Sequence, residues 1–408
     1  MITHMEIEGF RSFRDAAFDL SPFTVLVGPN GSGKTNLLEA VDLAGQLCRD
    51  GAEGTWASDD TGLRFFADLR PGDERRGRVL DLFHRAGDGS TTGRMRLVLC
   101  FLQSQRERLT HLRLELRADL GDGRSPSVSG RITLLSEAPA DWELTPDQRE
   151  DIAASARRGP SLFHSLPGGR WHWLVPEPAR MRTPADLVDD RQLASDGHNL
   201  AAVLGRLLTD PDRDPRRELL LRADAAAVLP GLVDLRPTPD PESGVWELDL
   251  VYRDASPVPV RLASYGTLHV LSLLTAAHAG LVAPHGMKSK GRGSDRVNRC
   301  STLMIEDVEN GLHPALVREL VSRLRRCTGE GQTQQLIVTT HSPVVLSAVY
   351  GDHSSDVFFV DTVSRVGGGG TPSRHSRVRP LAESGPRGSY VPAREARRYL
   401  ESAVASGA

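Results

Sequence analysis

The amino-acid sequence predicts a mixed α/β fold that joins a parallel sheet, covered on both faces, to an antiparallel lobe. In the C-terminal half, short apolar strands alternate with helices, which is typical of a parallel sheet, over 302–305, 314–326, 335–339, 343–349 and 357–360. Earlier, apolar and polar residues alternate with a period of two over 95–101, 112–116 and 132–135. This alternation predicts an antiparallel β-meander with one solvated face. A chain of 408 residues with 39% hydrophobic content can fill the cores of several such units.

The strongest chemical signal is a glycine-rich segment that follows the apolar run 23–27. It matches the phosphate-loop pattern G-x-x-x-x-G-K-[ST], with a strand before it and a helix after it: Gly28, Pro29, Asn30, Gly31, Ser32, Gly33, Lys34 and Thr35. The glycines let backbone N–H groups turn towards a polyphosphate, Lys34 supplies a positive charge, and the Thr35 hydroxyl can bind Mg²⁺. The helix expected from Lys34 to about Cys48 adds its N-terminal dipole, with Asn36 in the first turn. The chain is therefore predicted to bind a nucleoside triphosphate.

Two later strand ends place polar residues where a magnesium–nucleotide site needs them. Glu306 and Asp307 follow an apolar strand, so that one carboxylate can bind the metal while the next orients or deprotonates the attacking water. His341 follows the next predicted strand, where a neutral imidazole can contact a γ-phosphate and its water. A solvated strand end and a structural histidine are the alternative interpretations. Because a phosphate loop precedes both, we favour a site in which Thr35 and Glu306 bind Mg²⁺ and Glu306, Asp307 and His341 are catalytic.

Ser264 and Gly266 open a helix over 264–278 and could form a further anion-binding helix end, although these residues taken alone favour a plain helix cap. Taken in order, the phosphate loop, this helix end, the acidic strand and the histidine resemble ABC-type ATPases of the AAA family, in the branch of RecF, SMC and OLD-like proteins. The resemblance covers about residues 2–362 and includes the opening 7–13, with Arg11. It implies a P-loop NTPase fold of the ABC-ATPase type, with a mixed central sheet, an antiparallel β-meander lobe and a helical insertion.

The resemblance also implies how the site is assembled. ATP and Mg²⁺ are the expected cofactors, and an ATP-dependent head-to-tail homodimer is the expected assembly. Each site is then composite and takes residues from both copies: Arg11, 28–36, Glu306, Asp307 and His341 in cis, and Ser264 and Gly266 in trans.

Several features distinguish the chain from other members of that branch. Tyr265 stands in the signature where an aspartate is more usual, and Asp307 stands where most relatives have glutamate, so we expect a slow ATPase. Gln103 and Gln105 are candidates for the glutamine that contacts the metal. A zinc hook and a long coiled coil are absent from the sequence, and the segment after His341 is too short for the TOPRIM nuclease domain of OLD-type proteins. A standalone ATPase without nuclease activity of its own is expected.

Four regions are predicted along the chain. Residues 1–135 form an ATPase lobe with the phosphate loop and the β-meander, although the polar stretch 51–93 is expected to form loops. Residues 136–230 form a helical or irregular insertion. Residues 231–362 form a second ATPase lobe with the signature, the acidic strand and the switch histidine, and residues 363–408 form a flexible tail with one short helix.

The bulk composition limits the partners. A net charge of −3 gives no overall basic signature, so any contact with DNA must use a local patch. The best patch lies in a predicted loop, for which DNA contact and a solvated loop are equally supported: Lys288, Lys290, Arg292, Arg296 and Arg299. The four cysteines form no C-x-x-C pair, and no signal peptide or apolar run of membrane-spanning length is evident. A cytoplasmic protein without a membrane partner is expected.

Three functions are compatible with these features. The first is a dimeric ATPase that acts as a nucleotide-driven sensor or switch for a separate effector, such as a nuclease, in prokaryotic anti-phage defence or DNA transactions. The second is a RecF-like repair or recombination ATPase, which the segment Thr-His-Ser-Pro at 340–343 disfavours. The third is the nucleotide-binding subunit of a transporter, which the long separation of phosphate loop and signature disfavours. A neighbouring gene for a nuclease would favour the first, and one for a permease the third.

Overall fold

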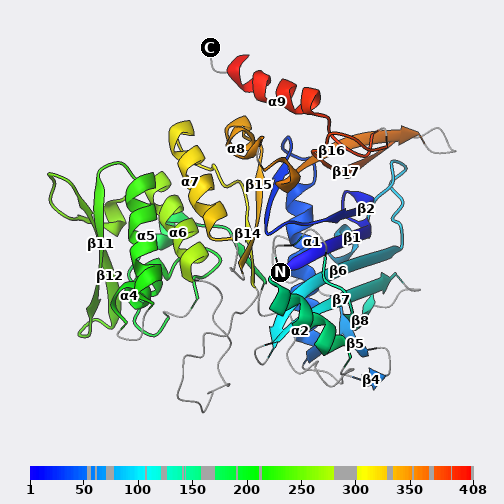
Figure 1. The fold of residues 1–408 in the computed structure, drawn as a ribbon, viewed down its shortest axis with the longest axis horizontal. Helices are drawn as coiled ribbons and strands as arrows, with labels where there is room; N and C mark the ends of the chain where they lie inside the picture. Colours follow the sequence, from blue (N-terminus) through cyan, green and yellow to red (C-terminus); the bar gives the residue numbers. More distant parts are fainter. Residues whose placement is uncertain are drawn as a thin grey trace.

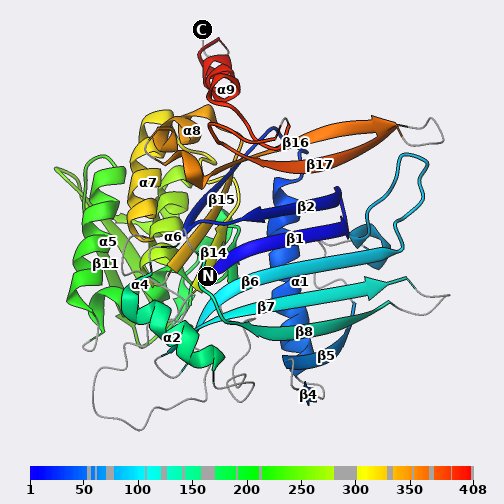
Figure 2. The same ribbon diagram turned by 45° about the vertical axis from the view of Figure 1, so that its right-hand side comes forward.

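A computed structural model of the chain describes residues 1–52, 57–59, 62–69, 78–105, 108–120, 126–139, 142, 144–157, 171–189, 192–210, 214–279, 301–328, 334–351, 353–366, 372–386 and 388–405. Within these ranges the strands form three sheets (Figure 1). The central sheet lies between a group of helices and a large antiparallel sheet. The strands of the antiparallel sheet are seen most clearly in Figure 2. No helix in the described ranges combines the length and the hydropathy that a membrane span requires.

The central sheet contains the predicted parallel strands, in the order β17-β16-β3-β15-β14-β9. Five of them are parallel to one another: β3 (Phe23–Val27), β9 (Trp171–Leu174), β14 (Ser301–Ile305), β15 (Gln334–Thr340) and β16 (Val357–Val366). The sixth, β17 (Pro372–Pro380), pairs antiparallel with β16. Every residue of β3, β9 and β14 is buried, as expected when both faces of a parallel sheet are covered. The predicted parallel sheet is confirmed, as part of a mixed sheet.

The two faces of this sheet pack against different layers. One layer consists of helices: α4 (Leu200–Thr209), α5 (Pro215–Val228), α6 (Tyr265–Ala279), α7 (Pro314–Arg326) and α8 (Pro343–Val349). Leu303, Ile305 and Val338 share a core with these helices. Met304 and Ile337, one position out of phase, instead share a core with α1 (Lys34–Ala52) and the antiparallel sheet. The strand ends therefore lie between two well-packed layers, which fixes the positions of the residues that follow them.

The antiparallel sheet has the order β2-β1-β6-β7-β8-β5-β4. Its strands are β1 (Ile2–Phe10), β2 (Phe13–Asp19), β4 (Ala57–Asp59), β5 (Gly62–Asp68), β6 (Arg94–Gln105), β7 (Arg108–Asp119) and β8 (Ser127–Leu135). Strands β6, β7 and β8 pair in sequence as an antiparallel meander, so that prediction is confirmed. Met95, Leu97 and Leu99 are buried, which is the apolar face that the alternation predicted.

Loops were predicted over residues 51–93, and this is wrong for part of the stretch. β5 pairs with β8 and β4 with β5, and a 3₁₀ turn spans Val79–Leu82. The buried Phe65 ring lies over Gly130, where a Cβ would approach it to 2.2 Å. The absence of a side chain at Gly130 makes room for this strand, and the polar composition of the stretch conceals it.

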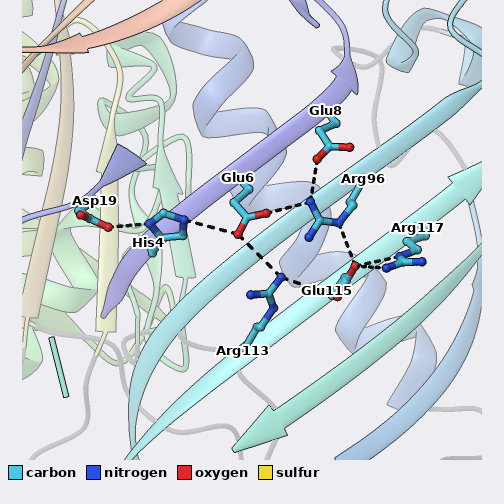
Figure 3. A network of polar contacts seen from close by, with 8 residues as sticks. All are labelled: His4, Glu6, Glu8, Asp19, Arg96, Arg113, Glu115 and Arg117. Atoms are coloured by element: carbon cyan, nitrogen blue, oxygen red, sulfur yellow. Dashed lines mark hydrogen bonds and ion pairs between the residues drawn. The ribbon is translucent and has the colours of Figure 1, made fainter. Parts of the chain in front are cut away.

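Charged side chains line the polar face of β1, β6 and β7, as Figure 3 shows. Arg96 Nη1 contacts Glu6 at 2.8 Å and Glu8 at 2.7 Å, and Arg96 Nε donates to Glu115 at 2.9 Å. The hydrogen bond to Glu115 raises the pKa of Arg96, against the effect of partial burial. Opposite charges across neighbouring strands stabilise antiparallel pairing. The solvated face of the meander is thus a network of ion pairs formed within the sheet.

The predicted helical insertion 136–230 contains α2 (Pro146–Ala156), α3 (Pro178–Met181), α4 and α5. Beside it lies a small antiparallel sheet of β10 (Ala185–Asp186), β12 (Val245–Tyr252) and β11 (Leu232–Asp240), with β13 (Val258–Pro259) paired to β12. The strand predicted over 258–262 is shorter than expected and continues as a 3₁₀ turn. A Cβ on Gly205 of α4 would lie 2.6 Å from the Trp246 ring, which shows how closely this helix packs on the small sheet.

The chain after residue 363 contains the predicted short helix, but it also forms a strand where a flexible tail was predicted. β17 pairs in register with β16, with Val378 opposite Val360, and helix α9 (Ala393–Ala405) follows. Leu381 and Val391 are buried between these elements. The Gly-, Ser- and Arg-rich composition conceals the strand because its pairing with β16, rather than an apolar pattern, holds it in place. The basic loop predicted at 287–299 lies outside the described residues.

A buried carboxylate links three of the helices. Asp224 of α5 accepts a hydrogen bond from His278 Nε2 of α6 at 2.9 Å. Its other oxygen accepts hydrogen bonds from Arg323 at 3.0 Å and Arg326 at 3.1 Å, both on α7. Burial opposes a charge on His278, but the bond to Asp224 and the contact with Cys327 outweigh it and raise the pKa of His278 to about 9. We refer to Asp224, His278, Arg323 and Arg326 as the Asp224 clamp.

The Asp224 clamp predicts a specific loss of stability at alkaline pH. The folded pKa of His278 lies above the ordinary value of 6.5, so its contribution is complete below pH 6.5 and is lost as the pH rises through 9. The free energy of unfolding should fall across this window by an amount on the order of 3 kcal/mol. Denaturant unfolding at both ends of the window measures this fall. His278→Gln should abolish it, whereas His198→Gln, at a more exposed histidine, should retain it. Equal falls in wild type and His278→Gln would contradict the assignment.

Candidate nucleotide-binding site

The predicted phosphate loop joins β3 to α1. Its first residue, Gly28, donates its N–H to the Thr340 carbonyl at 3.1 Å, which ties the loop to the end of β15. The Lys34 ammonium donates back to the carbonyls of Gly28 at 2.8 Å and Pro29 at 3.0 Å. Lys34 is 6% exposed, and burial lowers its pKa although the nearby acids Asp307, Glu309 and Glu306 oppose this. The loop therefore encloses a cation close to the acids at the strand ends.

Close contacts explain why two loop positions are glycine. A Cβ on Gly28 would lie 2.1 Å from the Val360 carbonyl oxygen, and a Cβ on Gly33 would lie 2.5 Å from Ser376 Oγ. Gly33 also has a φ of +106°, which L side chains rarely adopt. At Gly31 the φ is +72°, but a Cβ there would meet no atom within 4 Å among the described residues.

Gly28→Ala is expected to weaken ATP binding by at least about tenfold, because the obstructing atom belongs to the backbone of β16 and cannot move aside. The matched control is Gly31→Ala, which adds the same methyl group in open space and carries only the strain of a positive φ, about 1 kcal/mol. Titration calorimetry with ATP compares the two variants. Equal affinities would show that the geometry of this loop does not determine binding.

Hydroxyl and amide groups hold the loop from the side of β2 and β17. Ser376 Oγ donates to the Ser32 carbonyl at 2.6 Å and lies 2.8 Å from Ser12 Oγ. Asn36 Nδ2 donates to Ser12 Oγ at 2.6 Å. Sequence reasoning missed Ser12 and Ser376, and no local pattern indicates them, since 364 positions separate the two.

The predicted metal ligands lie side by side. Thr35 Oγ1, at the start of α1, donates to Glu306 Oε1 at the end of β14, at 2.5 Å. A hydroxyl and a carboxylate are oxygen ligands of the kind that Mg²⁺ prefers. This pair fits the magnesium ion that the sequence predicted.

Asp307 and His341 lie at neighbouring strand ends, with Oδ1 of the acid 3.6 Å from Nδ1 of the imidazole. Asp307 has a φ of 45°, and its N–H donates to Thr339 Oγ1 at 2.9 Å. Aspartate tolerates this left-handed backbone conformation better than most residues. Both side chains are partly exposed, so a nucleotide and its attacking water can reach them.

A third acid, Glu309, completes this group and was missed by sequence reasoning. It is 9% exposed, and its Oε1 accepts hydrogen bonds from Thr340 Oγ1 at 2.8 Å and from the His341 backbone N–H at 3.0 Å. The same oxygen is 3.3 Å from His341 Nδ1. Glu309 belongs to the acidic segment in the sequence, but its spacing from Asp307 indicates no function.

The predicted signature residues lie at the start of α6. Ser264 is exposed, and its Oγ accepts a hydrogen bond from the Thr267 N–H at 3.1 Å, as a helix cap does. A Cβ on Gly266 would lie 2.9 Å from the Gly311 carbonyl oxygen, so this helix end packs on the turn after the acidic strand. Within the described residues, no hydrogen bond or ion pair joins Ser264 or Gly266 to the phosphate loop of the same chain.

Arg11, predicted to contact the nucleotide, forms an ion pair with Glu39 of α1, with Nε 2.8 Å from Oε2. Its φ is 46°, and its N–H donates to the Leu82 carbonyl at 2.9 Å. Gln103 and Gln105 lie on β6, and Gln103 is 1% exposed within the antiparallel sheet.

The sequence profile of the family described as "AAA domain, putative AbiEii toxin, Type IV TA system" matches residues 23–347. The chain belongs to this family. The matched region of the AAA-domain protein runs from the strand before the phosphate loop to the helix after His341, so it includes the loop, Glu306, Asp307 and His341. The prediction that the chain is an ABC-type ATPase of the RecF, SMC and OLD branch is confirmed.

Curated relatives match this AAA-domain protein over short segments. An OLD nuclease of Thermus scotoductus is 44% identical over 43 residues, which are 10% of this chain and 8% of the relative. A DNA replication and repair protein RecF of a Nocardioides species is 45% identical over 47 residues, 11% of each chain. The matches thus span about a tenth of the length of these relatives.

Solved structures with the same fold are Smc head domains. An Smc head bound to the C-terminal winged-helix domain of ScpA has a TM-score of 0.53 at 17% identity, covering 93% of this chain and 98% of that one. The Pyrococcus furiosus Smc head with an extended coiled coil has a TM-score of 0.52 at 15% identity, covering 99% of each. These similarities confirm the predicted ABC-ATPase fold.

Proposed function

We propose that this protein binds Mg-ATP at the phosphate loop and hydrolyses it slowly, as an ATP-dependent head-to-tail homodimer. The observation that carries the proposal is the meeting of five side chains from α1 and two neighbouring strand ends: Lys34, Thr35, Glu306, Asp307 and His341. Thr35 already lies next to Glu306, and Asp307 next to His341, as the proposed roles require.

Each of these residues has a distinct task in hydrolysis. Lys34 and the loop N–H groups would bind the phosphates, and Thr35 with Glu306 would hold Mg²⁺, which when bound neutralises phosphate charge. Asp307, partly exposed beside them, would orient the attacking water or accept its proton. His341, 3.6 Å from Asp307, would contact the γ-phosphate.

The exposed start of α6 supports the dimer. Ser264 and Gly266 offer a helix N-terminus, which attracts anions, yet in the described residues they form no hydrogen bond or ion pair with the loop of their own chain. A second copy related by a twofold axis would bring this helix end over the γ-phosphate of the first, and each site would then need both copies.

Mixing two inactive variants tests the composite site. Lys34→Ala removes the cis cation, and Ser264→Arg blocks the trans helix end by bulk and charge. Each alone should be inactive, but a mixed dimer contains one site with both halves intact. About a quarter of the wild-type rate should return on mixing equal amounts, since half the dimers are mixed and each has one working site. No recovery, while sizing of the mixture with ATP shows that mixed dimers form, would reject the composite site.

A switch of this kind needs a separate protein to convert its closed state into an effect. The family description names a toxin of a toxin–antitoxin system, and an OLD nuclease is among the relatives, which supports an effector such as a nuclease in anti-phage defence. Three of the described acids after His341 are held by arginines: Asp356 by Arg325, Asp361 by Arg377, and Glu395 by Arg379. Purified protein should therefore not cut linear or nicked DNA with Mg²⁺ or Mn²⁺. Cleavage that survives Lys34→Ala would reveal a second active site.

The RecF similarity favours one other candidate function, a repair or recombination ATPase that loads partners on gapped DNA. For this function, the ATPase rate should rise with gapped duplex DNA and not with intact duplex. The defence switch predicts no such preference.

A further inference from the structure

Helix α9 packs on α8, next to the strand end that carries His341 (Figure 1). Its first turn is fixed to the central sheet, because Glu395 pairs with Arg379 of β17 at 2.7 Å and Ala396 is fully buried. Arg379 in turn contacts Asp361 of β16. The helix is therefore held against the same strands that flank the phosphate loop.

One side chain of α9 reaches the nucleotide site. The Tyr399 hydroxyl donates a hydrogen bond to the backbone carbonyl of His341 at 2.8 Å. Its ring meets Phe359 edge-on, with ring centroids 5.8 Å apart, and Phe359 pairs with Val27, the last strand residue before the phosphate loop. Burial, and then the charge of Glu309, raise the pKa of Tyr399 to about 12, so the hydroxyl keeps its proton at neutral pH.

The backbone of His341 is thereby held at both of its polar groups. Glu309 accepts its N–H at 3.0 Å, and Tyr399 donates to its carbonyl at 2.8 Å. Glu309 is buried and fixed by Thr340 as well, whereas Tyr399 belongs to a helix near the end of the described chain. Of these two contacts, only the one from Tyr399 comes from outside the strand ends of the central sheet.

We propose that Tyr399 is a positioning residue, through which helix α9 sets the orientation of His341 towards the γ-phosphate. This inference rests on the proposed ATPase function. It assigns a regulatory role to α9: a partner that shifts the helix changes the rate of hydrolysis without touching the nucleotide.

Kinetics of Tyr399→Phe test the proposal, since this change removes the hydroxyl and keeps the ring on Phe359. The kcat for ATP should fall about two- to tenfold, the range of one hydrogen bond, with KM and ATP affinity unchanged. Tyr390→Phe is the matched control, because Tyr390 precedes the same helix and its hydroxyl has no hydrogen bond within the described residues. An unchanged kcat, or a raised KM with a lowered unfolding temperature, would overturn the proposal.

A double-mutant cycle with His341→Ala separates positioning from a merely structural role. If Tyr399 acts through the imidazole, Tyr399→Phe should have no further effect on kcat in the His341→Ala background. Additive losses would reject the coupling. Failure of the ATPase proposal itself is distinguishable, because wild type would then be no more active than Lys34→Ala.

Discussion

Lys34→Ala is expected to lower kcat/KM for ATP by about 100- to 1000-fold, the loss typical of a preorganised electrostatic contact. Lys34 is 6% exposed and lies among Asp307, Glu309 and Glu306. Without its charge, these carboxylates would repel the phosphates that the loop is shaped to bind. ATPase assays and nucleotide titration measure the effect, and thermal unfolding should show that the fold is retained.

Arg94→Ala is the matched control for the loss of one positive charge. The Arg94 side chain is 88% exposed on the antiparallel sheet, where it pairs with Asp119, so its removal should leave kcat/KM unchanged. Wild-type turnover in Lys34→Ala would place the active site elsewhere.

Asp307→Asn is expected to stop hydrolysis while Mg-ATP still binds, with kcat lowered by about 100-fold or more. The amide cannot accept the proton of water, but Thr35 and Glu306 remain to hold the metal. Asparagine also tolerates the φ of 45° at this position, so the turn should be preserved. The variant should accumulate as a closed dimer with ATP, which size-exclusion chromatography detects.

Asp254→Asn provides the control for this substitution. Asp254 also has a positive φ, 57°, but lies in an exposed turn after β12, so the change should alter neither turnover nor assembly. The double variant Asp307→Asn/Ser264→Arg should bind ATP and stay open. If Asp307→Asn with ATP eluted like the nucleotide-free protein, the trapped dimer would be rejected.

Local sequence patterns predicted the parts of the site that lie at strand ends. The phosphate loop, Glu306, Asp307 and His341 each follow a short apolar run, and the carboxyl ends of parallel strands meet at one edge of a sheet. Because that rule needs only the order of the elements along the chain, the Thr35–Glu306 and Asp307–His341 contacts could be expected from the amino-acid sequence.

Contacts between distant segments could not be predicted in this way. Ser376, which bonds to Ser32, lies on a strand that was predicted as a flexible tail, and the bond from Tyr399 of the predicted helix to His341 could not be foreseen. The ion pair between Arg11 and Glu39 of α1 is likewise a contact that the motif around Arg11 does not show. The partners of such residues depend on which surfaces meet after folding. A single sequence without relatives does not show which surfaces these are.

The left-handed turn at Asp307 has a consequence for the rate of ATP hydrolysis. Short side chains that bond locally suit this conformation, and Thr339 holds the turn through both the Asp307 and Val308 N–H groups. We therefore expect that the turn, and not the chemistry of the acid alone, selects aspartate over the longer glutamate. Asp307→Glu should then fail to raise the rate of ATP hydrolysis. The lifetime of the ATP-bound state would depend on the backbone geometry of this turn.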